Sequence, residues 1–160
     1  MVTEFRAVTT EADVVLLDSA LRALSDDLGD RHVAGLDALR AGLMGDTPSA
    51  YGLLAVNRDV IGAALYSPVF STAQGAAGVY VSDLWVDEAT RGQGTGRRLL
   101  AEVAHRAGAQ WGAAWMTLAV YGHSTASRRF YERLGFASQD RVTQMRLPQA
   151  GFGRLKGEGR

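Results

Sequence analysis

The chain has 160 residues, of which 47% are hydrophobic, and this suits one globular domain with an apolar core. Its formal net charge is zero, because 17 basic side chains balance 17 acidic ones, which argues against a nucleic-acid or membrane-surface partner. The lack of cysteine excludes disulfides, thiolate metal sites and a cysteine acyl intermediate, and the three histidines are too scattered to suggest a metal site. No apolar run approaches a membrane span or a signal-peptide core, so a cytoplasmic protein is expected.

The elements predicted before residue 79 are a strand, two helices and a hairpin. Their apolar residues alternate or recur at helical intervals over residues 4–8, 14–28, 32–44, 51–56 and 59–66. Thr10 is suited to cap the first helix, and Asn57-Arg58 to form the turn of the hairpin. Pro68 is expected to close the second strand of that hairpin, and residues 70–78 are expected to form a loop.

A strand, a glycine loop and a helix follow one another at the centre of the sequence. Residues 79–86 are β-branched, apolar or aromatic and predict a strand, residues 92–96 contain three glycines, and a helical pattern begins at about Thr95. The start of a helix presents unpaired N–H groups and the positive end of the helix dipole, which together favour phosphate. Its first turn carries Arg97 and Arg98 and no carboxylate, as an anionic ligand would require.

The rest of the chain predicts a strand, a helix and a last strand. An apolar run over residues 113–120 is typical of a strand covered on both faces, and Ser124 can cap the helix that follows. Residues 136–147 predict one strand or two short ones, and residues 149–160 form a glycine-rich tail that is expected to be loosely ordered. The predicted fold class is therefore α/β, a mixed sheet with helices on both faces in the order βααβββαβαβ, in one domain over residues 1–148.

Two motifs resemble those of the GNAT superfamily, the acyl-CoA-dependent N-acetyltransferases. The glycine spacing fits neither a dinucleotide fingerprint nor a P-loop, but it resembles the pyrophosphate-binding motif of that family, [RQ]-x-x-G-x-[GA]. The matching residues are Arg91, Gly92, Gln93, Gly94, Thr95 and Gly96. Downstream, residues 124–136 resemble the family segment N-x-x-A-x-x-[FL]-Y-x-x-x-G-F. The resemblance covers residues 3–147 and implies the GNAT fold, with acetyl-CoA as co-substrate and no metal.

The resemblance also implies which residues bind acetyl-CoA. The backbone from Arg91 to Arg97 would hold the phosphates of CoA. The acetyl carbonyl and the pantetheine would meet backbone groups at the end of the central strand, provided that this strand parts from its neighbour. The residues concerned are Leu84, Trp85 and Val86. Ser124 and Ser127 occupy positions where the family commonly has Asn and Ala; both are small and polar enough to contact CoA, although Ser124 can also serve only as a helix cap.

The candidate acid is clear from the motif, but the base is not. Tyr131 matches the residue that protonates the leaving thiolate in the family, with simple core packing as the alternative. Many family members carry a glutamate as base at the position of Ser82. Asp83 is adjacent, but successive strand side chains face opposite ways, so a water relayed by Ser82 or by backbone carbonyls is the favoured base. Asp83 as a direct base and His123 are the other candidates.

The acceptor is predicted to be a primary amine, and a small cationic one is favoured. Residues 66–86 locally resemble the diamine and polyamine acetyltransferases, although Ser82 replaces an acidic residue of that subfamily. Asp26, Asp27 and Asp30 lie in the connection between the first two helices and would hold a second cationic group, unless they are simply solvated. A peptide or protein N-acetyltransferase and a non-catalytic acyl-CoA-binding module remain alternatives, and a homodimer is left open.

Overall fold

The computed structural model describes residues 2–158 of the chain. They form two compact units, one that ends at Tyr121 and one that begins at Gly122. The boundary lies inside residues 1–148, and the assignment of that whole range to one domain stays a prediction. Within the described residues, no helix is both long enough and apolar enough to cross a membrane.

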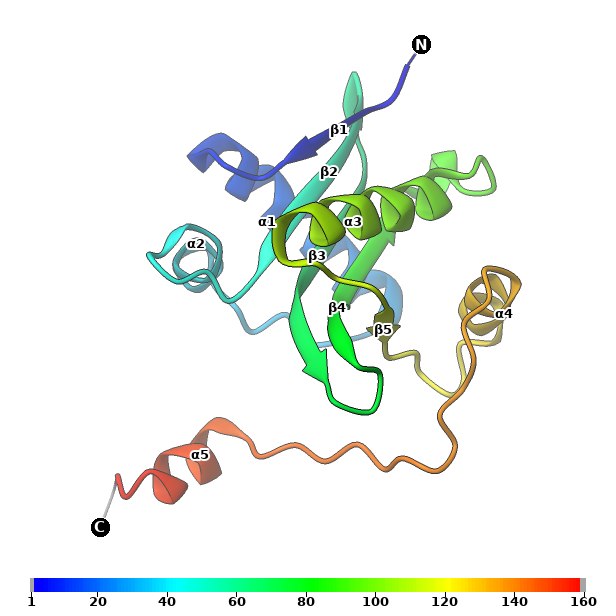
Figure 1. The fold of residues 1–160 in the computed structure, drawn as a ribbon. Coiled ribbons are helices and arrows are strands. Elements are labelled where there is room, and N and C mark those ends of the chain that lie inside the picture. The colour runs from blue at the N-terminus through cyan, green and yellow to red at the C-terminus, as the bar shows by residue number, and fades with distance from the viewer. Residues whose placement is uncertain (1, 159–160) are drawn as a thin grey trace. The chain divides into compact units, whose positions relative to one another are not determined.

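Five strands of the larger unit form one mixed sheet in the order β1-β2-β3-β4-β5 (Figure 1). The strands are β1 (Glu4–Ala7), β2 (Tyr51–Asn57), β3 (Asp59–Ser71), β4 (Ala76–Val86) and β5 (Met116–Leu118). Neighbouring strands from β1 to β4 are antiparallel, whereas β5 pairs with β4 in parallel. Arg58 has a φ of 63° between β2 and β3, so the tight hairpin predicted at Asn57-Arg58 is present.

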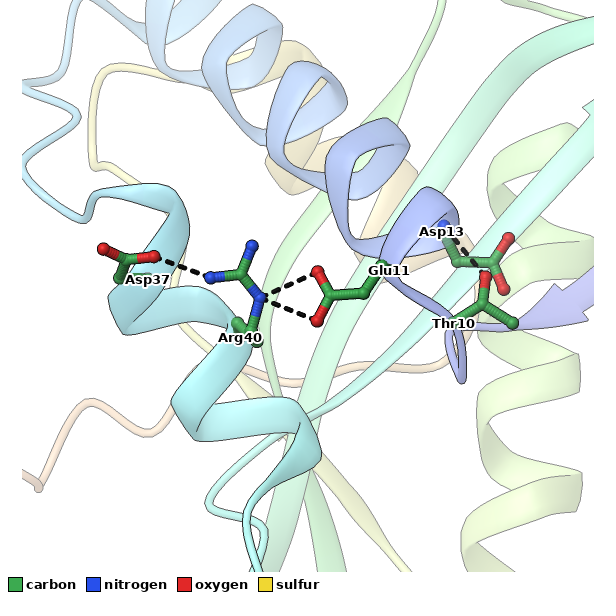
Figure 2. Close-up of polar contacts among 5 residues, drawn as sticks. All are labelled: Thr10, Glu11, Asp13, Asp37 and Arg40. Carbon is green, nitrogen blue, oxygen red and sulfur yellow. Dashed lines mark hydrogen bonds and ion pairs between the residues drawn. The ribbon is translucent and has the colours of Figure 1, made fainter.

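The helices of the larger unit are α1 (Glu11–Leu28), α2 (Leu36–Met44), the short 3-10 helix η1 (Glu88–Thr90) and α3 (Thr95–Trp111). The start of α1 is capped as predicted, because the backbone N–H of Asp13 donates to the Thr10 hydroxyl over 3.2 Å (Figure 2). Gly29 ends the helix in the left-handed conformation, with a φ of 71°. The second helix begins at Leu36, four residues later than predicted, and the connection from Gly29 to Gly35 is correspondingly longer.

Arg40 joins the first turn of α1 to α2. Its guanidinium lies 2.8 Å from the Glu11 carboxylate and 2.6 Å from the Asp37 carboxylate (Figure 2). Glu11 and Asp37 are largely exposed and Arg40 partly so, which means that water screens the pairs and each contributes little stability on its own. The contact joins the two helices at the end of α1 that lies farthest from Gly29.

Helices cover both faces of the sheet, as predicted. On one face, Leu17 of α1 packs in a core cluster with Leu54 of β2 and Ala63 of β3. On the other face, α3 runs across the sheet (Figure 1). There a Cβ at Gly62 would lie only 2.8 Å from the Leu99 side chain, so the missing side chain lets the helix approach β3 closely. The result is a three-layer α/β unit with the start of α3 held close to the sheet.

Two features of the sheet differ from the prediction. Pro68 does not close β3, because β2 pairs with β3 only as far as Tyr66. Beyond that point β3 is paired only with β4, and a proline is tolerated in such an edge strand where its nitrogen faces the side without a partner strand. Residues 70–78 accordingly complete a hairpin around a turn at residues 72–75 instead of forming a loop. The strand predicted over residues 113–120 is shorter, since only Met116–Leu118 pair with β4.

The smaller unit contains α4 (Thr125–Arg133) and α5 (Gln149–Leu155). Ser124 occupies the N-cap of α4 as predicted, but its side chain makes no capping hydrogen bond within the described part of the chain. The last strand predicted over residues 136–147 is not formed there. Val142 and Met145 are 70% and 89% exposed, so no buried apolar face holds that segment in a ladder. The tail that was expected to be loosely ordered instead forms α5, which begins after Pro148.

Candidate active site

The sheet forks where β5 ends. The ladder between β4 and β5 runs through Val79, Tyr80 and Val81, while β4 continues to Val86 with β3 still paired on its other side. The last residues of β4 therefore have no β5 ladder beside them within the described residues. The parting of strands expected at Leu84, Trp85 and Val86 is present. Backbone groups on this edge are available to a ligand that enters the fork.

A bulge at Ser82 sets which side chains face each side of β4 near the fork. Leu65 of β3 pairs with Asp83 and Tyr66 pairs with Val81, which leaves Ser82 as the extra residue. The exposed Ser82 hydroxyl lies 2.9 Å from the Asp83 carboxylate and 3.2 Å from the carbonyl oxygen of Leu65. Asp83 faces the same side as Leu65, toward α1 and α2, because directly paired residues share a face.

A cavity of about 310 Å³ lies on that face. It is enclosed by the last turns of α1, the connection to α2, α2 itself, β3 and β4. Its lining residues are Leu21, Ser25, Asp30, Arg31, His32, Val33, Ala34, Leu39, Leu65 and Asp83. Its size suits a small molecule or one side chain of a larger one. Polar and charged groups lie at its Asp83 wall and along the connection, while leucines, Val33 and Ala34 form the rest.

Asp83 is half-buried in this cavity, and burial raises its pKa above the usual value of 3.8. The Ser82 hydrogen bond and the nearby His32 lower the pKa of Asp83, and the Asp30 carboxylate raises it, but burial has the largest effect. A carboxylate whose pKa is raised accepts a proton more readily, as a general base requires. The cavity lies on the face to which Asp83 points, so of the two alternatives a direct role of Asp83 as base gains support, and the identity of the base stays a prediction.

The three aspartates of the connection are not brought together as expected. Asp30 lines the cavity and accepts a hydrogen bond of 2.6 Å from the Tyr121 hydroxyl. Asp27 is paired instead with Arg91, whose guanidinium lies 2.7 Å from its carboxylate. Asp26 is exposed and, like Asp27, is not among the residues that line the cavity. Of the trio, only Asp30 is placed to face a molecule bound beside Asp83.

The glycine loop ends at a helix start that is open to a ligand. Gly92 and Gly94 have φ values of 78° and 82°, a conformation that other residues adopt only at a cost. Gly94 is the N-cap of α3, and the first hydrogen bond across this end is donated by the N–H of Arg98 to the Gly94 carbonyl. The three preceding helical N–H groups, of Thr95, Gly96 and Arg97, are therefore the orphan donors that phosphate can use.

Two side chains of this region do not point to a phosphate. Arg91, the first residue of the motif, donates from Nε to the carbonyl oxygen of Val86 over 3.1 Å and from its other end to Asp27. Arg98 lies over the Phe5 ring, 5.8 Å from its centre. Arg97 is exposed and remains the side chain of the first turn that is best placed for an anion. The chemistry of the cradle is thus mainly that of the backbone.

Tyr131 lies within the smaller unit. Its ring packs edge-on against Phe130 and Phe136, with ring centres 5.1 Å and 5.5 Å apart. Burial raises the pKa of the Tyr131 hydroxyl above 10.0, so the phenol keeps its proton at neutral pH. A half-buried phenol in an apolar cluster agrees equally with core packing and with an acid, and the role of acid stays a prediction. Ser127 is exposed on α4.

His32 was not predicted as a site residue, because His123 was the one histidine considered as a base and His32 was weighed only as a metal ligand. Its Nδ1 lies 3.3 Å from the Ser25 hydroxyl and its Nε2 lies 3.7 Å from the Asp18 carboxylate. The ring lines the cavity, only two residues beyond Asp30. Its position two residues after Asp30, which was already expected at the acceptor site, was the signal in the sequence that could have identified His32. No group of three or more potential ligands arranged to hold a metal ion occurs among residues 2–158.

Solved structures share this fold over nearly the whole chain. An integron cassette protein from the mobile metagenome of V. cholerae is 20% identical, with a TM-score of 0.75 over 98% of each chain. An aminoglycoside acetyltransferase from an uncultured soil metagenomic sample is 18% identical, with a TM-score of 0.72 over 92% of this chain and 99% of the other. A ribosomal-protein-alanine N-acetyltransferase from Brucella melitensis is 16% identical, with a TM-score of 0.70 over 92% and 100%. At these identities the likeness establishes the fold.

The family is established by the sequence itself. No curated protein matches the chain significantly. The model of the Acetyltransferase (GNAT) family matches residues 17–136, three quarters of the chain, which include β4, the glycine loop, α3 and α4. The forked sheet and the glycine-capped start of α3 therefore lie in the region that the family model describes, and the chain belongs to the GNAT family of acetyltransferases.

Proposed function

We propose that the protein transfers an acetyl group from acetyl-CoA to a primary amine bound in the cavity beside Asp83. The observation that carries this proposal is the fork of β4 and β5 next to the glycine-capped start of α3, with a carboxylate-bearing cavity on the adjoining face of β4. The fork offers backbone groups to the acetyl carbonyl and the pantetheine, the helix start offers N–H groups to the phosphates, and the cavity receives the amine.

The proposed reaction is a direct transfer. The neutral amine attacks the thioester carbonyl, so that a C–N bond forms and the C–S bond breaks. The proton lost by the amine passes to Asp83, directly or through a water, and then to solvent. The thiolate takes a proton from the Tyr131 hydroxyl, which is then restored from solvent; the match of α4 to the family motif supports this role. Backbone N–H groups at the end of β4 would stabilise the developing oxyanion.

Two carboxylates, of Asp83 and Asp30, and one guanidinium, of Arg31, line the cavity, and the excess of carboxylates favours an amine that carries a second cation. A diamine could therefore present a neutral amine to Asp83 and an ammonium group to Asp30. An alkyl amine has a pKa of about 10.4, as lysine does, so the reactive neutral form becomes more abundant as the pH rises. We therefore propose a small cationic amine as acceptor, with activity that increases toward pH 9.

The test is thiol release from acetyl-CoA in the presence of matched amines. The panel contains an alkyl diamine, the monoamine of equal chain length, an aminoglycoside, a neutral arylamine and a peptide with a free N-terminus. We expect the diamine to be acetylated faster than the monoamine, because only the diamine can use both carboxylates. Equal or faster reaction of the arylamine or the peptide would contradict the proposed substrate class. Binding of acetyl-CoA without thiol release for any amine would contradict the enzymatic proposal and favour a binding module.

A further inference from the structure

We propose that Arg91 is a positioning residue that couples the cofactor loop to the acceptor cavity, so that binding of CoA orders the cavity for the amine. The inference rests on the proposed function and assigns a regulatory connection within the same site. It predicts that CoA and amine strengthen the binding of each other, since coupling between two ligands is reciprocal.

The contacts of Arg91 reach three parts of the larger unit. Its backbone belongs to the glycine loop, its Nε donates to the carbonyl oxygen of Val86 at the end of β4 over 3.1 Å, and its terminal nitrogen lies 2.7 Å from the Asp27 carboxylate. Asp27 is in the last turn of α1, 64 residues earlier in the chain. One side chain therefore ties the loop that holds the phosphates to the helix that leads into the cavity wall.

Asp27 is well placed to transmit such a constraint. Two backbone hydrogen bonds close the end of α1 around it, from Gly29 N–H to the Asp26 carbonyl and from Asp30 N–H to the Ser25 carbonyl. The residue directly after this closed turn, Asp30, lines the cavity and is itself held by the Tyr121 hydroxyl. The connection from α1 to α2 is therefore held at both sides of Gly29. Arg91 of the glycine loop contacts Asp27, and Tyr121, which follows β5, contacts Asp30.

The geometry also explains why the first residue of the phosphate motif does not point its charge at the phosphate. The Arg91 guanidinium is already engaged by Asp27 and Val86, so Arg91 offers a phosphate only its backbone. When a phosphate orders the loop, the guanidinium is held in place and the Asp27 contact becomes less costly to maintain. The pair is nearly half-exposed on both sides, 49% and 44%, so the coupling is modest, about 1.5- to 5-fold in affinity.

The test compares hydrogen exchange of the full chain with and without CoA. We expect CoA to slow amide exchange in residues 27–34 of the wild-type protein, and Arg91→Gln and Asp27→Asn to abolish that protection while each stays folded. Arg40→Gln is the matched control, because Arg40 ties α1 to α2 from the opposite end of the helix and touches neither the loop nor the cavity. The double variant should show no further loss beyond either single variant, since both remove the same contact.

Different outcomes separate this inference from the proposed function. If the wild-type chain does not bind CoA, the proposed function is wrong, and the coupling with it. If CoA binds but Asp27→Asn keeps the full protection of residues 27–34, the coupling alone is wrong. If Arg91→Gln weakens CoA binding while Asp27→Asn leaves both binding and protection unchanged, Arg91 contacts the phosphate directly and the positioning role is refuted.

Discussion

The Gly94→Ala variant tests the cofactor cradle most directly. Gly94 is the N-cap of α3, with a φ of 82°, and a Cβ added there would meet no atom of the described chain within 4 Å. The methyl group therefore causes no clash in the free protein. It would, however, stand at the mouth of the helix start, where the phosphate must come within hydrogen-bonding distance of the backbone.

The two effects of the substitution have separable magnitudes. An alanine in the left-handed conformation costs about 1–2 kcal/mol of stability, which corresponds to a fall in Tm of about 2–8 °C for a chain of this length. Loss of one hydrogen bond to a charged group costs about 1.5–3 kcal/mol, so the affinity for CoA should fall about tenfold to a hundredfold. The stability loss should be the same wherever a glycine of this conformation is replaced in open space.

Gly112→Ala provides that comparison. Gly112 lies at the other end of the same helix, has a φ of 73°, and likewise has no atom within 4 Å of an added Cβ among the described residues. Thermal unfolding should show similar losses for both variants, while calorimetry should show weaker CoA binding for Gly94→Ala only. Unchanged CoA affinity in a folded Gly94→Ala protein would refute the cradle. Equal weakening in both variants would mean that strain in α3, and not the phosphate contact, lowers the affinity.

Three further variants test the proposed catalytic groups. Asp83→Asn should remove the acidic limb of the pH–rate profile. Because burial raises the pKa of Asp83 in the folded protein, the wild-type chain loses stability as the pH rises above 3.8 and through the folded pKa. The neutral Asn side chain should restore that stability, which would be measured as a higher Tm at neutral pH. An acidic limb that survives in Asp83→Asn would exclude Asp83 as the base. Ser82→Ala removes a hydrogen bond that lowers the pKa of Asp83, so the acidic limb should move to higher pH, and a limb that stays in place would show that the hydroxyl does not act on Asp83. Tyr131→Phe should lower kcat by about 10²–10⁴-fold with little change in the KM for acetyl-CoA, whereas a loss of less than about threefold would return Tyr131 to a packing role.

The fold of the larger unit could be predicted because its signals are local. The Thr10 cap, the Asn57-Arg58 turn and the glycines before Thr95 act within a few residues of themselves, and each lies where it was expected. The wrong predictions concern elements whose extent depends on a segment that is distant in the sequence. Whether Pro68 ends a strand depends on how far β2 extends beside it, and this length cannot be inferred from the residues around the proline.

The same distinction applies to the end of the chain. Residues 136–147 have the composition of a strand, but a strand forms only when another strand pairs with it and its apolar residues are covered. In the structure Val142 and Met145 remain exposed, and the segment forms no ladder among the described residues. The helix after Pro148 was missed because Gly151 and Gly153 lower the helix propensity of a short segment.

The proposed cofactor cradle comes from a continuous motif, whereas the proposed acceptor site combines residues from distant segments. Asp30 and His32 reach the cavity from the connection after α1, and Asp83 reaches it from β4. Nothing in the spacing of these residues shows that they meet. The pairing of Asp27 with Arg91 across 64 residues was equally beyond local inference, and it occupies a carboxylate that was expected to hold a cationic group of the acceptor.

Whether the chain carries a carboxylate base depends on the bulge at Ser82, which the regular alternation of strand side chains does not predict. Counting back from Val86, Asp83 shares a face with Trp85, which packs against the core cluster of α1 and α2. The bulge at Ser82 then breaks the alternation, so that Val81 pairs with Tyr66, whose ring packs on Trp111 of α3. A serine at the position of the family glutamate therefore need not mean a lost base. The extra residue is turned out to solvent, and the next residue carries the carboxylate into the cavity, with the serine hydroxyl adjusting its pKa from outside.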